Sequence, residues 1–276
     1  MTFTTASKLT LPNGAAIPHI HLGVYMMTSR EAERSVTAAL ANGYRGIDSA
    51  QWYANEAACG AAIGRSGIPR SEIFYTTKLQ TNTSYDATRA AIKTSLKKSG
   101  MDYIDLYLLH SPYGGPQKRA ECWRAVEDAV LEGEVKSAGV SNFGVKHIKE
   151  LLDRGVRVKP VVNQIEVHPF NQNREIVEYC KEQGIVIEAY APLVRGMRMR
   201  HPVLREVAKK YGVTPAQVLV RWGLQMGFVV LPKSTKEQRI KENADVAGFE
   251  IGEEDMKKLA ELDEGLVTDW DPTDAA

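Results

Sequence analysis

The sequence predicts an α/β protein in which eight parallel strands close into a (β/α)8 TIM barrel. Eight short apolar runs of strand length alternate with segments that carry apolar residues at helical spacing. Parallel strands joined by helical crossovers form right-handed units, and eight such units close on themselves. The length of 276 residues, without a low-complexity or charged linker, suits one domain spanning residues 1–276. A doubly wound open sheet usually carries Gly-x-Gly-x-x-Gly after its first strand, and this motif is missing here.

A small hairpin is predicted before the barrel, and we expect it to close the bottom of the barrel. Residues 8–11 and 15–18 are short extended runs on either side of the turn sequence Pro12-Asn13-Gly14. The expected barrel strands are residues 19–24, 45–48, 73–78, 104–110, 136–140, 161–165, 185–189 and 228–231.

The helices are predicted from their apolar faces and from residues that favour helix starts. Thr28-Ser29 precedes the first amphipathic segment, and we expect Asn55 to cap the second. The expected helices are residues 28–43, 55–66, 84–98, 117–131, 144–152, 171–183, 202–211, 214–226, 235–244 and 253–262. The last two follow the eighth strand and are extra C-terminal helices.

Composition excludes several classes of partner. The formal net charge is +1, which provides no basic field to attract nucleic acid. No run of about 18 apolar residues is present, so we expect no membrane span. Residues 1–5 lack the features of a secretory signal. Three widely spaced cysteines, Cys59, Cys122 and Cys180, suit a reducing compartment, and we expect a cytoplasmic protein.

Ionisable residues stand at the ends of three successive strands. In a (β/α)8 barrel the active site lies at the carboxyl ends of the strands, and Asp48, Lys78 and His110 end the second, third and fourth. Tyr53 lies on the loop after Asp48. The other strand ends carry Ser141-Asn142, Gln164 and Glu166, Tyr190, and Lys233-Ser234.

Each of these residues alone has an ordinary structural explanation, such as a helix cap, a packing aromatic or a solvated charge. Together they permit a specific chemistry. A phenol with a pKa of about 10 is a poor acid at neutral pH unless its anion is stabilised. Lys78 beside Tyr53, held by Asp48, would stabilise it, and His110 would orient a carbonyl group. No activated nucleophile and no metal cage accompany them, so a hydride from a bound cofactor is the simplest reaction partner.

The chain resembles the aldo-keto reductases along essentially its whole length. The motifs that carry the resemblance are Gly46-Ile47-Asp48-Ser49-Ala50 with Tyr53 and Asn55-Glu56, Lys78, Asp105-Leu106-Tyr107-Leu108-Leu109-His110, Gly139-Val140-Ser141-Asn142-Phe143, Asn163-Gln164-Ile165-Glu166-Val167-His168-Pro169, Tyr190-Ala191-Pro192-Leu193 and Pro232-Lys233-Ser234-Thr235 with Arg239-Ile240 and Glu242-Asn243. The resemblance is to the compact microbial and fungal branch, which includes diketogluconate, prostaglandin F and polyketone or ketoacid reductases.

The resemblance implies a catalytic tetrad of Asp48, Tyr53, Lys78 and His110, with Tyr53 as the proton donor. It implies an NADPH site in which Tyr190 stacks on the nicotinamide and Ser141, Asn142 and Gln164 hold its carboxamide. Lys233, Ser234 and Arg239 match the positions that bind the 2′-phosphate. The full expected cofactor set is Gly23, Val24, Ser141, Asn142, Gln164, Tyr190, Pro192, Leu193, Lys233, Ser234, Thr235, Arg239, Glu242 and Asn243. The expected substrate contacts are Tyr25, Trp52, His110, Tyr113 and Trp270.

The implied activity is NADPH-dependent reduction of small aldehydes and ketones by a monomeric enzyme. One alternative is the reverse reaction, an NAD(P)+-dependent aldose or alcohol dehydrogenase. Another is a nucleotide-sensing scaffold subunit. The sequence departs from the family pattern at Ser111, where a tryptophan is usual, and in the basic, methionine-rich segment 194–200. That segment is either a further phosphate contact or a solvated loop.

Overall fold

A closed barrel of eight parallel strands forms the centre of the computed structural model, which describes residues 3–276. Adjacent strands pair in chain order from β3 to β10, and a parallel bridge between Ile20 and Val230 joins the first to the last. The strands are β3 (His21–Gly23), β4 (Gly46–Asp48), β5 (Phe74–Leu79), β6 (Ile104–Leu109), β7 (Val135–Ser141), β8 (Val162–Glu166), β9 (Val186–Tyr190) and β10 (Val229–Val230). The predicted (β/α)8 fold is confirmed.

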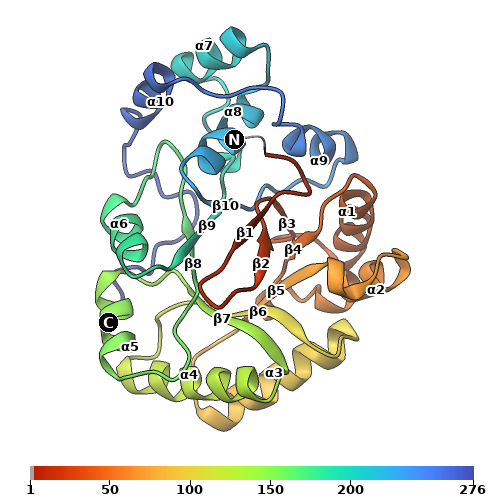
Figure 1. Ribbon diagram of the computed structural model, residues 1–276, viewed down its shortest axis with the longest axis vertical. Helices are drawn as coiled ribbons and strands as arrows, with labels where there is room; N and C mark the ends of the chain where they lie inside the picture. The colour runs from red at the N-terminus through yellow and green to blue at the C-terminus, as the bar shows by residue number, and fades with distance from the viewer. Residues whose placement is uncertain (1–2) are drawn as a thin grey trace.

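The helices surround this barrel (Figure 1). They are α1 (Ser29–Ala41), α2 (Glu56–Arg65), α3 (Tyr85–Ser99), α4 (Pro116–Leu131), α5 (Val145–Asp153), α6 (Arg174–Glu182), α7 (Pro202–Tyr211), α8 (Pro215–Gln225), α9 (Glu237–Ala244) and α10 (Glu253–Ala260). Thr28 begins α1 with a capping box that includes Glu31, and Thr214 begins α8 in the same way. Helices α9 and α10 both follow β10, the last barrel strand, as the sequence predicts.

The N-terminal hairpin closes one end of the barrel, as the sequence predicts. Strands β1 (Lys8–Thr10) and β2 (Ala16–Pro18) pair antiparallel and lie across the barrel centre in Figure 1. Leu11 and Ile17 are buried in a cluster with Leu106, Leu108 and Val229 from the barrel strands. This apolar plug leaves the opposite end, where the strands terminate, as the open end.

Above the plug, the barrel interior becomes polar. His21 on β3 and Glu188 on β9 are fully buried, with 3.8 Å between His21 Nδ1 and Glu188 Oε1. The His21 ring occupies the space beside Gly46, where an added Cβ would lie 2.0 Å from His21 Cδ2. Asp48 and Lys78, at the carboxyl ends of β4 and β5, lie in the next layer toward the opening. Buried ionisable groups therefore lie directly beneath the open end of the barrel.

The expected role of Asn55 as a helix cap is wrong in its detail. Asn55 precedes α2, but its side chain makes no capping hydrogen bond. Its amide instead donates to the carbonyl groups of Val24 and Met27 at 3.0 and 3.2 Å, and it accepts from Ser49 Oγ at 2.8 Å. This side chain therefore ties together the loops after β3 and β4, next to Tyr53.

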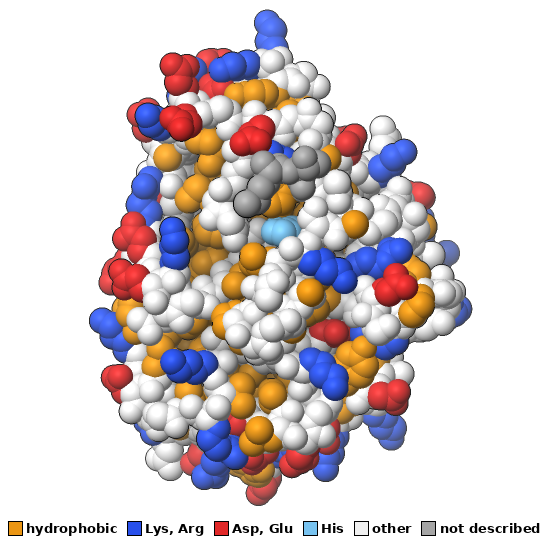
Figure 2. All heavy atoms as spheres, in the orientation of Figure 1, with side chains coloured by type: hydrophobic (Ala, Val, Ile, Leu, Met, Phe, Trp, Pro, Cys, Tyr) orange, Lys and Arg blue, Asp and Glu red, His pale blue; other side chains and the backbone are white. Residues whose placement is uncertain are grey.

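The outer surface carries mixed charges. Figure 2 shows basic and acidic side chains interspersed on the face that includes the hairpin, without a large area of one sign. This distribution agrees with the small net charge of +1. None of the helices within residues 3–276 is long and apolar enough to cross a membrane.

Candidate active site

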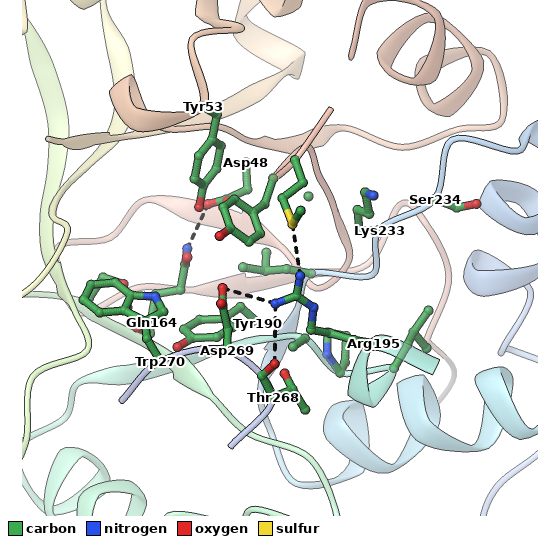
Figure 3. A pocket seen from close by; sticks show the side chains of 18 of the residues that line it. Asp48, Tyr53, Gln164, Tyr190, Arg195, Lys233, Ser234, Thr268, Asp269 and Trp270 are labelled. Carbon is green, nitrogen blue, oxygen red and sulfur yellow. Dashed lines mark hydrogen bonds and ion pairs between the residues drawn. The ribbon is translucent and has the colours of Figure 1, made fainter. Parts of the chain in front are cut away.

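A cavity of about 1080 Å³ occupies the open end of the barrel (Figure 3). It extends from the ends of the central strands to the first turn of α8 and along α9. The sequence-predicted residues that line it are Gly23, Tyr25, Asp48, Trp52, Tyr53, His110, Tyr113, Ser141, Asn142, Gln164, Tyr190, Pro192, Leu193, Lys233, Ser234, Arg239, Glu242, Asn243 and Trp270. Val24 and Thr235 do not line it, and Lys78 lies below its floor.

The four tetrad residues come together because β4, β5 and β6 are neighbours. Lys78 is fully buried, and its Nζ donates to Asp48 Oδ1 at 2.6 Å and to the Ser49 carbonyl at 2.8 Å. Tyr53 ends a 3₁₀ turn, Gln51–Tyr53, that follows β4. The Lys78 ammonium lies 5.1 Å from the centre of the Tyr53 ring, and the His110 ring centre lies 5.8 Å from it.

Burial sets the protonation states of Tyr53 and His110. It raises the pKa of the Tyr53 phenol well above 10, and the negative charge of Asp48 adds to this effect. The sequence argument expected Lys78 to lower the pKa of Tyr53. In the structure burial and Asp48 raise that pKa instead, although the Lys78 ammonium lies 5.1 Å from the centre of the Tyr53 ring. Burial and the nearby Lys78 lower the pKa of His110 to about 3. At neutral pH the site thus holds a neutral phenol and a neutral imidazole.

Asn142 and Tyr190 form a hydrogen-bonded wall beside the tetrad. Asn142 has a left-handed backbone with φ of 60°, which turns its side chain into the cavity at the end of β7. Its Nδ2 donates to the His110 carbonyl at 3.0 Å, and its Oδ1 accepts from the Tyr190 hydroxyl at 2.9 Å. Ser141 Oγ donates to the Gln164 carbonyl at 2.9 Å. These bonds hold the predicted nicotinamide-side residues in one fixed arrangement.

Two cations at the far end of the cavity make no side-chain hydrogen bond or ion pair with residues 3–276. Lys233 follows β10 and Arg239 lies in α9, and within the described chain neither side chain has a hydrogen bond or ion pair. Glu242, by contrast, accepts from Thr214 Oγ1 at 2.8 Å. Two exposed cations whose hydrogen-bond donors are not used within the described chain suit a phosphate group.

Sequence reasoning missed a bridge across the cavity. Arg195 follows β9, and its guanidinium lies 3.2 Å from the Asp269 carboxylate of the C-terminal segment. It also donates to the Thr268 carbonyl at 3.5 Å and lies 3.0 Å from the Met26 sulfur (Figure 3). These contacts connect Arg195, within the basic segment 194–200, to the C-terminal segment and to the loop after β3. A basic loop gave a signal for Arg195, whereas nothing in the sequence pointed to Asp269.

The expected substrate-side aromatic residues form one wall of the cavity. The Trp270 ring lies 5.7 Å from Tyr113 and 6.4 Å from His110, and Tyr25 lies 5.0 Å from Tyr53, between ring centres. Trp52 is 62% exposed, and its indole N–H donates to the Gln80 carbonyl at 2.7 Å. This bond orients the ring at the cavity mouth. No cluster of metal-ligating side chains occurs in residues 3–276.

The buried ionisable groups give the fold a characteristic pH dependence. Burial raises the pKa of Glu188 from 4.5 to about 8, so between these values the folded protein keeps a proton that the unfolded chain releases. Stability from this group therefore falls as the pH rises to 8. Burial lowers the pKa values of His21 and His110 from 6.5 to about 3, so stability from these groups falls as the pH drops below 6.5.

We expect the melting temperature to be highest near pH 6.5. Between its unfolded and folded pKa values, each group changes the free energy of unfolding by about 1.4 kcal/mol per pH unit. Glu188 therefore lowers the free energy of unfolding by roughly 2 kcal/mol between pH 6.5 and 8. Thermal unfolding followed from pH 4 to 9 measures this profile. Glu188→Gln removes the titrating group and is expected to flatten the alkaline side, while the acid side stays. An unchanged alkaline side in this variant contradicts the assignment.

Acid–base side chains lie beside a cavity at the carboxyl ends of the barrel strands. This is where (β/α)8 barrel enzymes have their active sites. The chain belongs to the aldo/keto reductase family, whose model matches residues 20–264. It is therefore an oxidoreductase, and members of this family typically use NAD(P)H.

Relatives match along nearly the whole chain. An uncharacterized oxidoreductase of Schizosaccharomyces pombe is 48% identical over 270 residues, covering 96% of this chain and 97% of that protein. A glyoxal reductase of Bacillus subtilis is 45% identical over 254 residues, covering 91% of each. The solved structure of an aldo-keto reductase from a Medee basin deep-sea metagenome library superposes with a TM-score of 0.91 and 41% identity, covering 95% and 96%.

Proposed function

We propose that this oxidoreductase is an NADPH-dependent carbonyl reductase that converts aldehydes or ketones to alcohols. The observation that carries the proposal is the buried Lys78–Asp48 pair beside Tyr53 at the base of the cavity. A phenol next to a held cation is a general acid for a carbonyl oxygen. The family membership supports the same reaction class.

The lining residues fit a nicotinamide dinucleotide phosphate. Asn142 and Gln164 would hold the carboxamide, and Tyr190 would contact the ring, at the end of the cavity next to the tetrad. Lys233 and Arg239, whose side chains make no hydrogen bond or ion pair within the described chain, would hold the 2′-phosphate at the other end. A cavity of about 1080 Å³ is large enough for a ligand of this size.

The reaction follows from the roles of the four tetrad residues. NADPH, when bound, would supply the hydride for the carbonyl carbon. Tyr53 donates its phenolic proton to the carbonyl oxygen, and its raised pKa keeps that proton in place at neutral pH. His110, as a neutral imidazole, donates a hydrogen bond to the same oxygen and orients it. Lys78, held by Asp48, offsets the negative charge that develops on Tyr53.

The substrate side favours a small, neutral carbonyl compound. Its wall consists of aromatic rings and uncharged polar groups, and Arg195, a cation in the cavity lining, is already paired with Asp269. The similarity to a glyoxal reductase supports small dicarbonyl aldehydes as first candidates.

The direct test is NADPH consumption by the purified protein with glyoxal, aromatic aldehydes, keto acids and sugars. We expect turnover with glyoxal and aromatic aldehydes. Absence of consumption with every compound overturns the proposal. Tight NADPH binding without turnover in either direction would instead favour the nucleotide-sensing role. Alcohol oxidation with NADP+ reports the reverse reaction of the same site.

The preference for NADPH over NADH is expected to depend on Lys233 and Arg239. The double variant Lys233→Met/Arg239→Leu removes two charged contacts to the 2′-phosphate and should raise the KM for NADPH about 100-fold. The KM for NADH, which lacks this phosphate, should change by less than about threefold. Lys236→Met is the matched control, because Lys236 is exposed nearby but does not line the cavity. Equal losses for both cofactors contradict the assignment.

A further inference from the structure

A fully buried carboxyl group lies just below the cavity floor, outside the residues that the proposed reaction requires. Glu188 on β9 has no solvent exposure, and its Oε2 accepts a hydrogen bond from Gln164 Nε2 at 2.8 Å. The two residues are register partners on β8 and β9, so strand pairing brings them together. The same nitrogen donates to Asp48 Oδ2, also at 2.8 Å. The Gln164 amide is therefore clamped between two carboxyl groups.

This clamp decides which end of the Gln164 amide faces the cavity. An amide NH2 has two N–H donors, and Asp48 and Glu188 use both. The reverse orientation would point the amide oxygen at Asp48, whose ionised carboxylate can only accept hydrogen bonds. Gln164 lines the cavity, where Figure 3 shows its side chain reaching toward Asp48. The atom that remains for a ligand is its carbonyl oxygen, which is a pure acceptor.

We propose that Glu188 is a positioning residue that makes Gln164 an acceptor for the carboxamide N–H of a nicotinamide cofactor. The inference rests on the proposed function, in which Gln164 contacts that carboxamide. One hydrogen bond to Asp48 leaves the amide free to rotate about a soft terminal torsion. The second bond, to Glu188, fixes its plane. A cofactor with a carboxamide NH2 then finds an acceptor, and a ring without that N–H does not.

Glu188 serves this role without carrying charge at neutral pH. The ionisable groups that face it are His21 from β3, Asp48 from β4 and Lys78 from β5. Burial, followed by repulsion from Asp48, raises the pKa of Glu188 to about 8. Oε2 still accepts from Gln164 when the proton resides on Oε1, which has no hydrogen-bond partner among the described side chains. A glutamine at position 188 offers the same acceptor, so it should replace the glutamate.

The test compares NADPH with its 3-acetylpyridine analogue, in which a methyl group replaces the carboxamide NH2. Dissociation constants are measured by fluorescence titration of the wild type, Glu188→Met and Glu188→Gln. The wild type should bind NADPH about tenfold more tightly than the analogue, the equivalent of one hydrogen bond. Glu188→Met should lose most of this preference, because NADPH weakens while the analogue does not. Glu188→Gln should retain it.

Val229→Ala is the matched control, because Val229 is the register partner of Glu188 on β10 and packs in the apolar cluster. It loosens the same layer and should leave the preference intact. If Glu188→Met does not fold, Glu188→Ser, whose side chain is too short to reach Gln164, takes its place. A preference that survives removal of the carboxyl group, or a loss that affects both cofactors equally, overturns the inference. A wild type that binds neither cofactor overturns the proposed function itself.

Discussion

Replacing Tyr53 with phenylalanine is expected to lower kcat for carbonyl reduction by about three orders of magnitude and to leave the Kd for NADPH unchanged. A positioned general acid contributes about 10²–10⁴-fold to a rate, and Tyr53 is the proton donor in the proposed mechanism. The phenyl ring keeps the packing against Tyr25 and His110, at 5.0 and 5.8 Å between ring centres, so the cavity should hold its shape. Single-turnover kinetics and cofactor titration separate the two effects.

Tyr25→Phe is the matched control for this substitution. Tyr25 is a second tyrosine at the cavity mouth and is 42% exposed. Its substitution by phenylalanine also removes one hydroxyl group. Its hydroxyl has no role in the proposed proton transfer, so kcat should stay within a few-fold of the wild type. Full turnover by Tyr53→Phe would remove the proton donor from the mechanism, and equal losses in both variants would point to a general effect on the cavity.

The barrel could be predicted because its strands and helices are short, repeated and strongly patterned. The ends of three strands could also be predicted directly from the sequence. Strand β4 ends at Asp48, β5 ends one residue after Lys78, and β6 ends one residue before His110. Register then brings those ends together. Knowing which residues stand at the strand ends was therefore enough to predict that the four tetrad residues lie close together.

Contacts between distant loops could not be predicted in the same way. Arg195 and Asp269 meet across the cavity from segments that no local pattern relates, and their pairing depends on the path of the C-terminal segment. Glu188 did leave a signal, because a glutamate interrupts the apolar run of β9. The role of Glu188 could be inferred only from the pairing of β8 with β9, which makes Gln164 its partner. Asn55 was placed correctly before α2, yet tertiary contacts redirected its side chain.

The polar layer links stability to the proposed chemistry. Within the barrel, Asp48 and Glu188 surround one Gln164 amide, and Lys78 pairs with Asp48. Water would satisfy these groups in the unfolded chain, so each must find its partners inside the barrel. The same hydrogen bonds that satisfy them also aim Lys78 at Tyr53 and Gln164 at the cavity. A change to one member should therefore alter folding and function together.

Lys78→Met is expected to show this most strongly, with a loss of about 3–5 kcal/mol in the free energy of unfolding and loss of turnover. Lys78 is fully buried and lies 2.6 Å from Asp48, so its removal leaves a buried carboxylate without its cation. Methionine fills the space with an unbranched apolar chain, which isolates the effect of charge. Urea unfolding at neutral pH measures the stability change.

The double variant Asp48→Asn/Lys78→Met removes both charges and should recover a large part of this stability. The two substitutions together should cost about 2–3 kcal/mol less than the sum of the single effects, as expected for directly paired groups. Turnover should stay absent, because neither the cation beside Tyr53 nor its anchor is restored. Additive losses of stability would mean that Asp48 does not depend on Lys78 for its burial. Recovered turnover in the double variant would mean that the charge of Lys78 plays no part in proton donation by Tyr53.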